Sequence, residues 1–318
     1  MANSGWIAAK PGLLSHQAYC RRTASADFLS IFSANDSAVS YHINHTFHER
    51  RLMANTLSAP FPTLFISHGS PMMSIAPGNT GRFWEQLAAR LPRPRAILSV
   101  SAHWLTHQPA VSAVQRPETI HDFYGFPAPL YEIQYSPPGA PNLAEKISQL
   151  IPGIAIDPQR GLDHGAWVPL RFMYPQADIP VTQFAVMPEA SPEAHYRLGQ
   201  RLQSLTQEGV LIMASGSITH NLRDVQRDAA DGQAMPYVTE FTNWFADALT
   251  RRDLPALFDY RRQAPHAVRA HPSDDHLLPL YVALGAAGSP KNAAHCAVLY
   301  REVTMGAVAM DAYQFTAA

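Results

Sequence analysis

The feature that most constrains the fold is an apolar segment that ends abruptly in a histidine, within residues 65–71. The apolar run at 64–66 is typical of a short buried strand. The residues that follow cannot continue a sheet, because Gly69 frees the backbone to turn and Pro71 lacks an N–H donor. His68 therefore lies where a core strand leaves its sheet, and in open α/β folds ligand sites gather at the carboxyl ends of strands.

The same pattern returns twice. The apolar segment 96–102 runs directly into His103, and the apolar segment 210–215 runs through a short polar turn to His220. A single histidine after a strand is more often structural than functional, so the repetition carries the argument. Neutral imidazole is the commonest protein ligand for metals. Three strand ends that each lead to a histidine therefore predict a metal site.

Strand and helix patterns alternate along the chain. Segments with apolar residues at helical spacing are found at 79–91, 141–151, 191–207, 237–249 and 277–286. Further strand patterns are found at 181–186, 295–301 and 306–314. No linker divides residues 59–318. We therefore predict one α/β domain with a central mixed, mostly parallel sheet flanked by helices, and with the metal site at the carboxyl ends of the strands.

Residues 1–58 do not share this patterning. Helix and strand periodicity is poor, the regions of a signal peptide are absent, and Met53-Ala54-Asn55 repeats the opening Met1-Ala2-Asn3. We expect an N-terminal extension over 1–58 that is disordered or arises from an upstream start-codon assignment, with residues 1–52 dispensable. Three histidines in this segment have the spacing of a metal tract, but the poor patterning around them argues against a site: His42, His45 and His48.

Charge and cysteine content exclude several classes of protein. The formal net charge is −1 and no run of lysine or arginine occurs, so the basic footprint of a nucleic-acid binder is missing. No apolar stretch approaches the length of a membrane-spanning helix. The two cysteines, Cys20 and Cys296, form no CxxC motif, and we predict a reducing, cytoplasmic compartment. We expect a monomer or a small homo-oligomer.

The candidate site residues are histidines and carboxylates near strand ends and helix starts: His68, His103, His164, His220, His276, Asp122, Asp163, Asp274 and Asp275. Asp122 and Asp163 could each orient an imidazole or could merely cap a turn. The aromatic segment 119–127 is punctuated by Gly125 and Pro127, which places it on a loop. This loop could form a wall of a substrate pocket, with His121 and Phe126 as the residues that contact substrate.

The other histidines have simpler interpretations. His107, His195, His266 and His295 lack the strand-end setting, and we expect them to be surface or packing residues. His271 precedes His276 in the same loop and is an alternative ligand. A serine hydrolase is disfavoured because the G-x-S-x-G elbow is absent.

Six motifs, in order over residues 62–310, carry a family resemblance: Ser67-His68-Gly69-Ser70-Pro71, Ser101-Ala102-His103-Trp104, Thr119-Ile120-His121-Asp122-Phe123 with Gly125-Phe126-Pro127, Asp163-His164-Gly165-Ala166-Trp167, Ala214-Ser215-Gly216 with His220-Asn221-Leu222, and His276-Leu277-Leu278-Pro279-Leu280. In these motifs the chain resembles the DODA-type extradiol aromatic ring-opening dioxygenases. That branch belongs to the class III superfamily of protocatechuate 4,5-dioxygenase. The resemblance identifies residues 59–318 as an extradiol ring-cleavage catalytic domain.

The resemblance implies one mononuclear non-haem metal ion per chain, held by His68, His103 and His276. His220 would be a fourth ligand or an acid/base residue, and His164 would bind substrate or O₂. Protocatechuate-type members have a glutamate at the position of His276. Iron(II) oxygenases favour two histidines and one carboxylate, whereas an all-imidazole site suits zinc. The resemblance to dioxygenases implies Fe(II) for activity. The all-imidazole ligand set makes Zn(II) the alternative occupant.

The implied function is a metal-dependent extradiol dioxygenase. It would open the ring of a catechol, DOPA-like or a related dihydroxy aromatic, with O₂ to give a muconic semialdehyde. Two alternatives remain open on the sequence: a zinc-dependent hydrolase that uses the same histidine cluster, and a non-catalytic binding member of the superfamily. Nothing in the sequence assigns an arginine or lysine to a substrate carboxylate.

Overall fold

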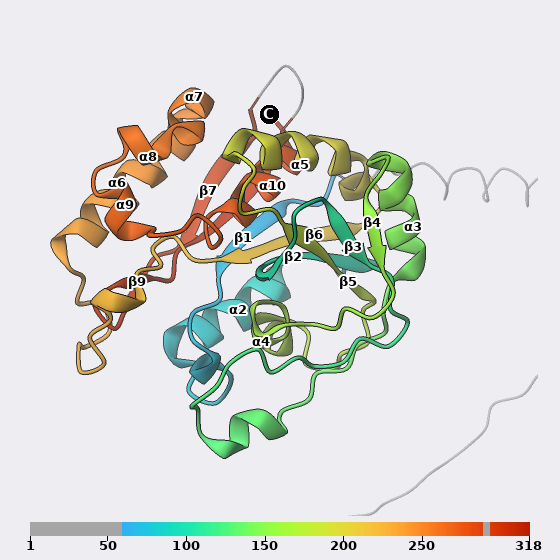
Figure 1. The fold of residues 1–318 in the computed structure, drawn as a ribbon, viewed down its shortest axis with the longest axis horizontal. Coiled ribbons are helices and arrows are strands. Elements are labelled where there is room, and N and C mark those ends of the chain that lie inside the picture. Colours follow the sequence, from blue (N-terminus) through green and yellow to red (C-terminus); the bar gives the residue numbers. More distant parts are fainter. Residues whose placement is uncertain (1–58, 289–292) are drawn as a thin grey trace, which may run out of the picture. The chain divides into compact units, whose positions relative to one another are not determined.

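A computed structural model describes residues 59–288 and 293–318 (Figure 1). The predicted extension over 1–58, with its three histidines, lies outside the described residues, so the expectations about it stay predictions. Within the described part, no helix combines the length and apolar character that a membrane crossing requires.

An eight-stranded sheet forms the centre of the fold. The strand order is β4-β3-β5-β2-β6-β1-β10-β7. The strands span the following residues: β1 Thr63–Ser67, β2 Ala96–Leu105, β3 Ala110–Ser112, β4 Ala155–Asp157, β5 Val181–Val186, β6 Val210–Gly216, β7 His295–Tyr300 and β10 Ala312–Thr316. The four central strands β5, β2, β6 and β1 are parallel, whereas β10 pairs antiparallel with both β1 and β7. The predicted mixed, mostly parallel sheet is confirmed.

Helices cover both faces of the sheet, as Figure 1 shows. One face packs against α2 (Gly78–Arg90) and α4 (His164–Met173), and the other packs mainly against α5 (Pro192–Gln207) and α10 (Leu278–Ala287). Because both faces are covered, the central strands read as continuous apolar runs rather than alternating ones. The remaining helices lie mainly on the α5 and α10 side: α3 Pro141–Leu150, α6 Pro236–Arg251, α7 Leu254–Phe258, α8 Tyr260–Gln263 and α9 Ala267–Ala270.

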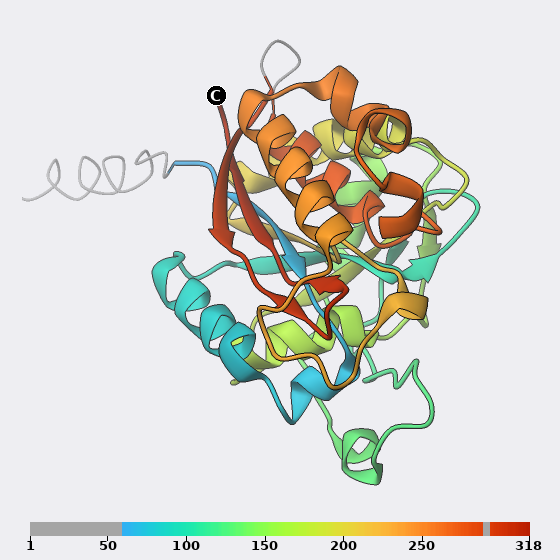
Figure 2. The same ribbon diagram turned by 90° about the vertical axis from the view of Figure 1, so that its left-hand side faces the viewer.

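The C-terminal part differs from the expected pair of strands. The predicted strand at 306–314 is wrong as one element, because it divides into β9 (Val308–Ala309) and β10. Met305 and Gly306 both have positive φ angles, and this turn joins β8 (Val303–Thr304) to β9 in a separate two-stranded ladder. Figure 2 shows α6 beside the edge formed by β7 and β10.

The second histidine strand also differs from prediction. We expected the strand to end before His103, but β2 continues to Leu105, and His103 lies within it. The pairing of β2 with β5 shifts register between Val100 and Leu105. An irregularity of this kind bends a strand and redirects its side chains. His103 is therefore directed by a distorted strand rather than by a loop.

Candidate metal centre and active site

All five histidines proposed from the sequence line one cavity of about 640 Å³. His68 follows β1, His103 lies in β2 and His220 lies beyond the end of β6. The carboxyl ends of these parallel strands meet at one edge of the sheet. His164 is the first residue of α4, and His276 lies just before α10. Strand ends and helix starts thus converge on the same space.

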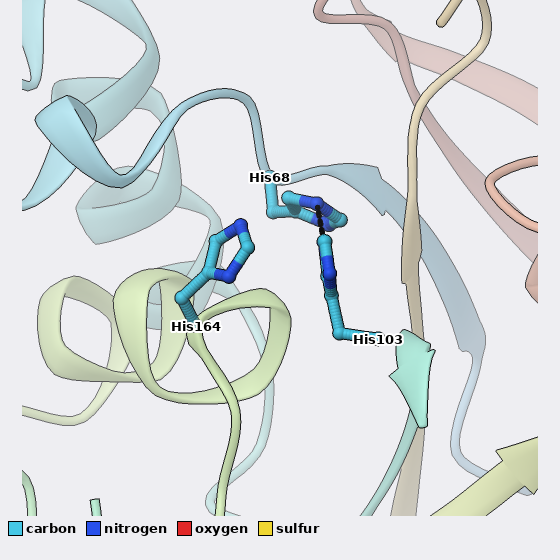
Figure 3. A group of neighbouring side chains, drawn as sticks. All are labelled: His68, His103 and His164. Atoms are coloured by element: carbon cyan, nitrogen blue, oxygen red, sulfur yellow. Dashed lines mark hydrogen bonds between the residues drawn. The ribbon is translucent and has the colours of Figure 1, made fainter. Parts of the chain in front are cut away.

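The imidazole rings contact one another directly. The Nε2 atoms of His68 and His103 are 3.0 Å apart, and Figure 3 shows these two rings meeting beside the ring of His164. The ring centroids of His103 and His164 are 3.9 Å apart. His220 stacks on His276 with ring centroids 3.4 Å apart and an interplanar angle of 9°. Two groups of possible ligands result: His68, His103 and His164; and His220, Asp275 and His276.

Ser215 sets the tautomer of His68. The Ser215 hydroxyl donates to the carbonyl of Gly165, so its oxygen is free to accept from Nδ1–H of His68 at 3.0 Å. With the proton on Nδ1, Nε2 of His68 presents a lone pair to the cavity. Ser215 is a polar residue in the fully buried strand β6, and such a residue within an apolar run is the signal that could have identified it.

Asp122 joins two of the histidines. Its Oδ2 lies 2.9 Å from Nδ1 of His164 and 3.3 Å from Nδ1 of His103. Its Oδ1 accepts the backbone N–H of His164 at 2.9 Å. Burial opposes ionisation of Asp122, but the hydrogen bond and charge of His164 outweigh it and hold the pKa at about 2. The carboxylate is therefore ionised. In both rings it favours the tautomer that carries its proton on Nδ1 and leaves a lone pair on Nε2.

His276 carries the clearest sign of a missing partner. Its Nδ1 lies 2.5 Å from Oδ2 of Asp275, whereas its buried Nε2 has no hydrogen-bond partner among the described residues. A Cβ at Gly216 would lie 2.0 Å from the His276 carbonyl oxygen. That carbonyl accepts the N–H of Ser217 at 2.9 Å. Only glycine at the end of β6 lets the backbone of His276 approach so closely.

The electrostatics of the cluster suit a cation. Burial lowers the pKa of His68 and His276 well below its usual value, and neighbouring imidazoles lower it further. Burial likewise lowers the pKa of His103 and His220 to about 4. These four side chains are therefore neutral at pH 7, which is the form that binds metal. Neutral imidazoles around an orphaned buried nitrogen fit a metal ion.

Asp163 has a different role from Asp122. It is fully buried and caps the start of α4. It accepts hydrogen bonds from Ser101, Gln183 and Arg160 at 2.6, 2.8 and 2.6 Å. Arg160 also donates to the carbonyl of His103 at 3.2 Å. The network therefore ties the irregular part of β2 to the start of α4. Sequence analysis missed Arg160, whose surroundings carry no motif.

Two other predicted residues lie outside the cluster. Asp274 bonds to Tyr260 and Arg261 rather than to a cavity histidine. His271 is buried, with its Nε2 2.7 Å from the carbonyl of Ile218. The four histidines expected at the surface or in packing positions lie away from the cavity: His107, His195, His266 and His295.

The aromatic loop forms part of the cavity wall. Phe126 lines the cavity together with Phe123 and Tyr124. His121 is not among the lining residues, because its Nε2 lies 3.0 Å from the carbonyl of Ile133 and its ring packs near Trp167. Further lining residues were not proposed as site residues from the sequence: Leu222, Val225, Arg227, Met305 and Val308.

A second depression lies away from the histidines. It has a volume of about 710 Å³ and is lined by residues of α2 and α4 and the turn after α4, among them Glu85 and Arg171. It is more open than the histidine cavity and contains none of the candidate ligands. The chemistry therefore resides in the smaller cavity.

Comparisons with known proteins agree with this site. Residues 62–310 match the family described as the catalytic LigB subunit of aromatic ring-opening dioxygenase. A protein of Beta vulgaris named 4,5-DOPA dioxygenase extradiol is 43% identical over 262 residues, covering 80% of this chain and 96% of that protein. A protein of Escherichia coli K12 with the same name is 38% identical over 234 residues, covering 72% of this chain and 86% of that protein.

A solved structure extends the similarity to the fold. A crystal structure of an uncharacterized protein from Escherichia coli K12 superposes with a TM-score of 0.67 at 30% identity, covering 80% of this chain and 99% of the other. The family predicted from the motifs is confirmed, and these relatives give no support to the hydrolase or the non-catalytic alternative. The chain belongs to the LigB family of aromatic ring-opening dioxygenases and is an extradiol ring-cleaving enzyme.

Proposed function

We propose that this enzyme opens the ring of a catechol, DOPA-like or a related dihydroxy aromatic, outside its two hydroxyl groups. Both atoms of O₂ would enter the product, a muconic semialdehyde. The relatives named 4,5-DOPA dioxygenase extradiol support this substrate class. The observation that carries the proposal is the buried, unpartnered Nε2 of His276 beside the other cavity histidines.

The proposed metal ligands are His68, His103 and His276. Their ring centroids form a nearly regular triangle, with separations of 4.9 Å between His68 and His103, 5.4 Å between His68 and His276, and 4.9 Å between His103 and His276. A bound metal ion, Fe(II) for activity with Zn(II) as the alternative occupant, would supply a common site for the catechol oxygens and O₂ and a route for electrons between them.

His220 is proposed to accept a proton from a catechol hydroxyl. It lines the cavity and is neutral at pH 7, because burial lowers its pKa to about 4. The charge of Asp275 acts in the opposite direction and favours the imidazolium that proton transfer creates. Its stacking on His276 equally suits a fourth ligand. Replacement of this side chain separates the two roles.

His164 is proposed to hold an oxygen atom of substrate or O₂. Asp122 fixes its Nδ1, so Nε2 is the atom left for the cavity. The hydrogen bond from its own backbone N–H to Asp122 fixes the start of α4 as well. The aromatic side chains of Phe123 and Phe126 line the cavity and suit the flat ring of a catechol.

The test is oxygen consumption by anaerobically Fe(II)-loaded protein with a panel of catechols, read together with the yellow absorbance of a semialdehyde. We expect uptake and colour with at least one catechol, and neither with Zn(II)-loaded protein. Loaded protein that consumes no O₂ across the panel would contradict the proposal.

The acid/base role of His220 has its own test. The His220→Ala variant is expected to keep most of its Fe(II) content and to lose turnover, because its proton acceptor is gone. Metal content and kcat are measured on the same preparation. A variant with normal kcat rules out the base role, whereas a variant that no longer binds metal indicates a fourth ligand.

A further inference from the structure

One permanent cation faces the catalytic cavity. Arg227 lies on the segment between η3 (Leu222–Asp224) and α6, and it lines the same cavity as the aromatic loop. Among the described residues that line this cavity, none is aspartate, glutamate or lysine. Apart from the metal ion proposed above, Arg227 is thus the permanent charge on the wall.

We propose that Arg227 determines substrate specificity by binding an anionic group, foremost a carboxylate, on the ring substituent of the catechol. The inference rests on the proposed function and adds to it a residue and a substrate class. A guanidinium presents a planar fork of N–H donors that matches the two oxygens of a carboxylate. Because the histidines and Arg227 line the same cavity, a ring held near the histidines could extend such a substituent to the guanidinium.

The backbone around Arg227 is held in place. The N–H of Gln226 donates to the carbonyl of Met305 at 2.9 Å, and the N–H of Met235 donates to the carbonyl of Gly306 at 2.9 Å. Met305 itself lines the cavity. The segment that carries Arg227 is therefore tied to the turn between β8 and β9, which fixes the position of its Cα atom relative to the pocket.

The guanidinium is available to a ligand. Within residues 59–288 and 293–318, no ion pair or hydrogen bond engages the side chain of Arg227, whereas the nearby Arg269 pairs with Asp224 at 2.8 Å. Arg223 is likewise exposed and without a side-chain partner in the described part of the chain, but it does not line the cavity. Arg223 is therefore a matched control for the effect of charge alone.

The cavity has room for a substituted ring. Its volume of about 640 Å³ lies within the range of about 300–1,000 Å³ that is common for small-molecule sites. Leu222 and Val225 line it on the side of Arg227, and Phe123 and Phe126 line the aromatic wall. Apolar walls and one unpaired guanidinium among the described lining residues suit a flat ring that ends in an anion.

The test compares dihydrocaffeate, a catechol with a carboxylate side chain, with its neutral primary amide. Both are supplied to Fe(II)-loaded wild type, Arg227→Gln, Arg227→Lys and Arg223→Gln. We expect Arg227→Gln to lower kcat/KM for the acid by about ten- to one-hundredfold, mainly through KM, and to change the amide by less than about threefold. Arg227→Lys should retain part of the preference, and Arg223→Gln should leave both values unchanged.

One outcome would overturn the inference: Arg227→Gln leaves the ratio of kcat/KM for acid and amide unchanged, whether both values fall equally or neither falls. A wild type that turns over neither compound, although another catechol of the panel gives O₂ uptake, shows only that these two catechols are not substrates. In that case, calorimetric titration of the same metal-loaded proteins decides the role of Arg227. Tighter binding of the acid by wild type than by Arg227→Gln supports the inference, and equal binding refutes it.

Discussion

Asp122 offers the sharpest test of how the site is built. One carboxylate oxygen accepts from Nδ1 of His164 at 2.9 Å and lies 3.3 Å from Nδ1 of His103. In Asp122→Asn the size is kept, but the charge is lost and one oxygen becomes an NH₂ donor. If that donor faces an imidazole, the ring must place its proton on Nε2, where it can no longer bind metal.

The expected magnitude follows from these contacts. Loss of a carboxylate that orients a metal-binding histidine costs about 10- to 100-fold in metal affinity, or about 1.4–2.8 kcal/mol. Asp122 contacts one proposed ligand and one proposed oxygen-binding residue. We therefore expect the loss of metal affinity to lie at the upper end of this range. We expect kcat/KM to fall further, because His164 loses its orientation as well.

The assay is competition for Fe(II) or Zn(II) against a chromophoric chelator, followed by kinetics on fully loaded protein. Asp178→Asn is the control, because Asp178 forms only a half-exposed surface ion pair with Arg93. We expect this control to keep the metal affinity of wild type. An Asp122→Asn variant with unchanged affinity and unchanged kcat/KM would refute the argument that this carboxylate sets the tautomers of the two rings.

Three further predictions concern stability, each measured by urea unfolding. Gly216→Ala should cost about 1–3 kcal/mol and weaken metal binding, because its Cβ would lie 2.0 Å from the His276 carbonyl oxygen; wild-type values would contradict this. Arg160→Lys should cost about 1–3 kcal/mol, since it loses the Nη2 group that donates both to the buried Asp163 carboxylate and to the His103 carbonyl, whereas Arg197→Lys at a surface pair should cost under about 0.5 kcal/mol. Burial raises the pKa of Asp311 to about 6, so the contribution of this carboxyl group to stability should fall by up to about 3 kcal/mol as the pH rises from about 4 to 6. The difference in stability between wild type and Asp311→Asn should follow this fall, and a difference that does not change with pH would refute it.

The sheet could be predicted where its strands are long and buried on both faces. The apolar runs at 64–66 and 210–215 identified β1 and β6, and therefore the edge on which His68 and His220 lie. Strands β3 and β4 were missed because three-residue segments carry too little pattern. The extension of β2 through His103 was missed because the irregular pairing with β5 is a property of two strands, not of one.

The five histidines could be found from local pattern and family motifs, but their arrangement could not. Asp122 reaches His164 and His103 only because the fold packs an aromatic loop against the start of α4. Two roles were left open for Asp122, and its contact with Nδ1 of His164 favours orientation of an imidazole over capping of a turn, whereas Asp274 bonds to Tyr260. Arg227 carries no motif, and its relevance appears only once the lining of the cavity is known.

The distribution of the histidines along the chain affects how metal binding couples to folding. His68 lies near the beginning of the described chain and His276 near its end, and the segments between them supply the other cavity histidines. No short fragment of an unfolded chain can gather these side chains, so the metal would bind the native state almost exclusively. By mass action, free metal at one hundred times its dissociation constant would then add about 2.7 kcal/mol to the free energy of unfolding. A catalytic ion held in this way would also link two parts of the polypeptide that are distant in the sequence, once the native fold has brought them together.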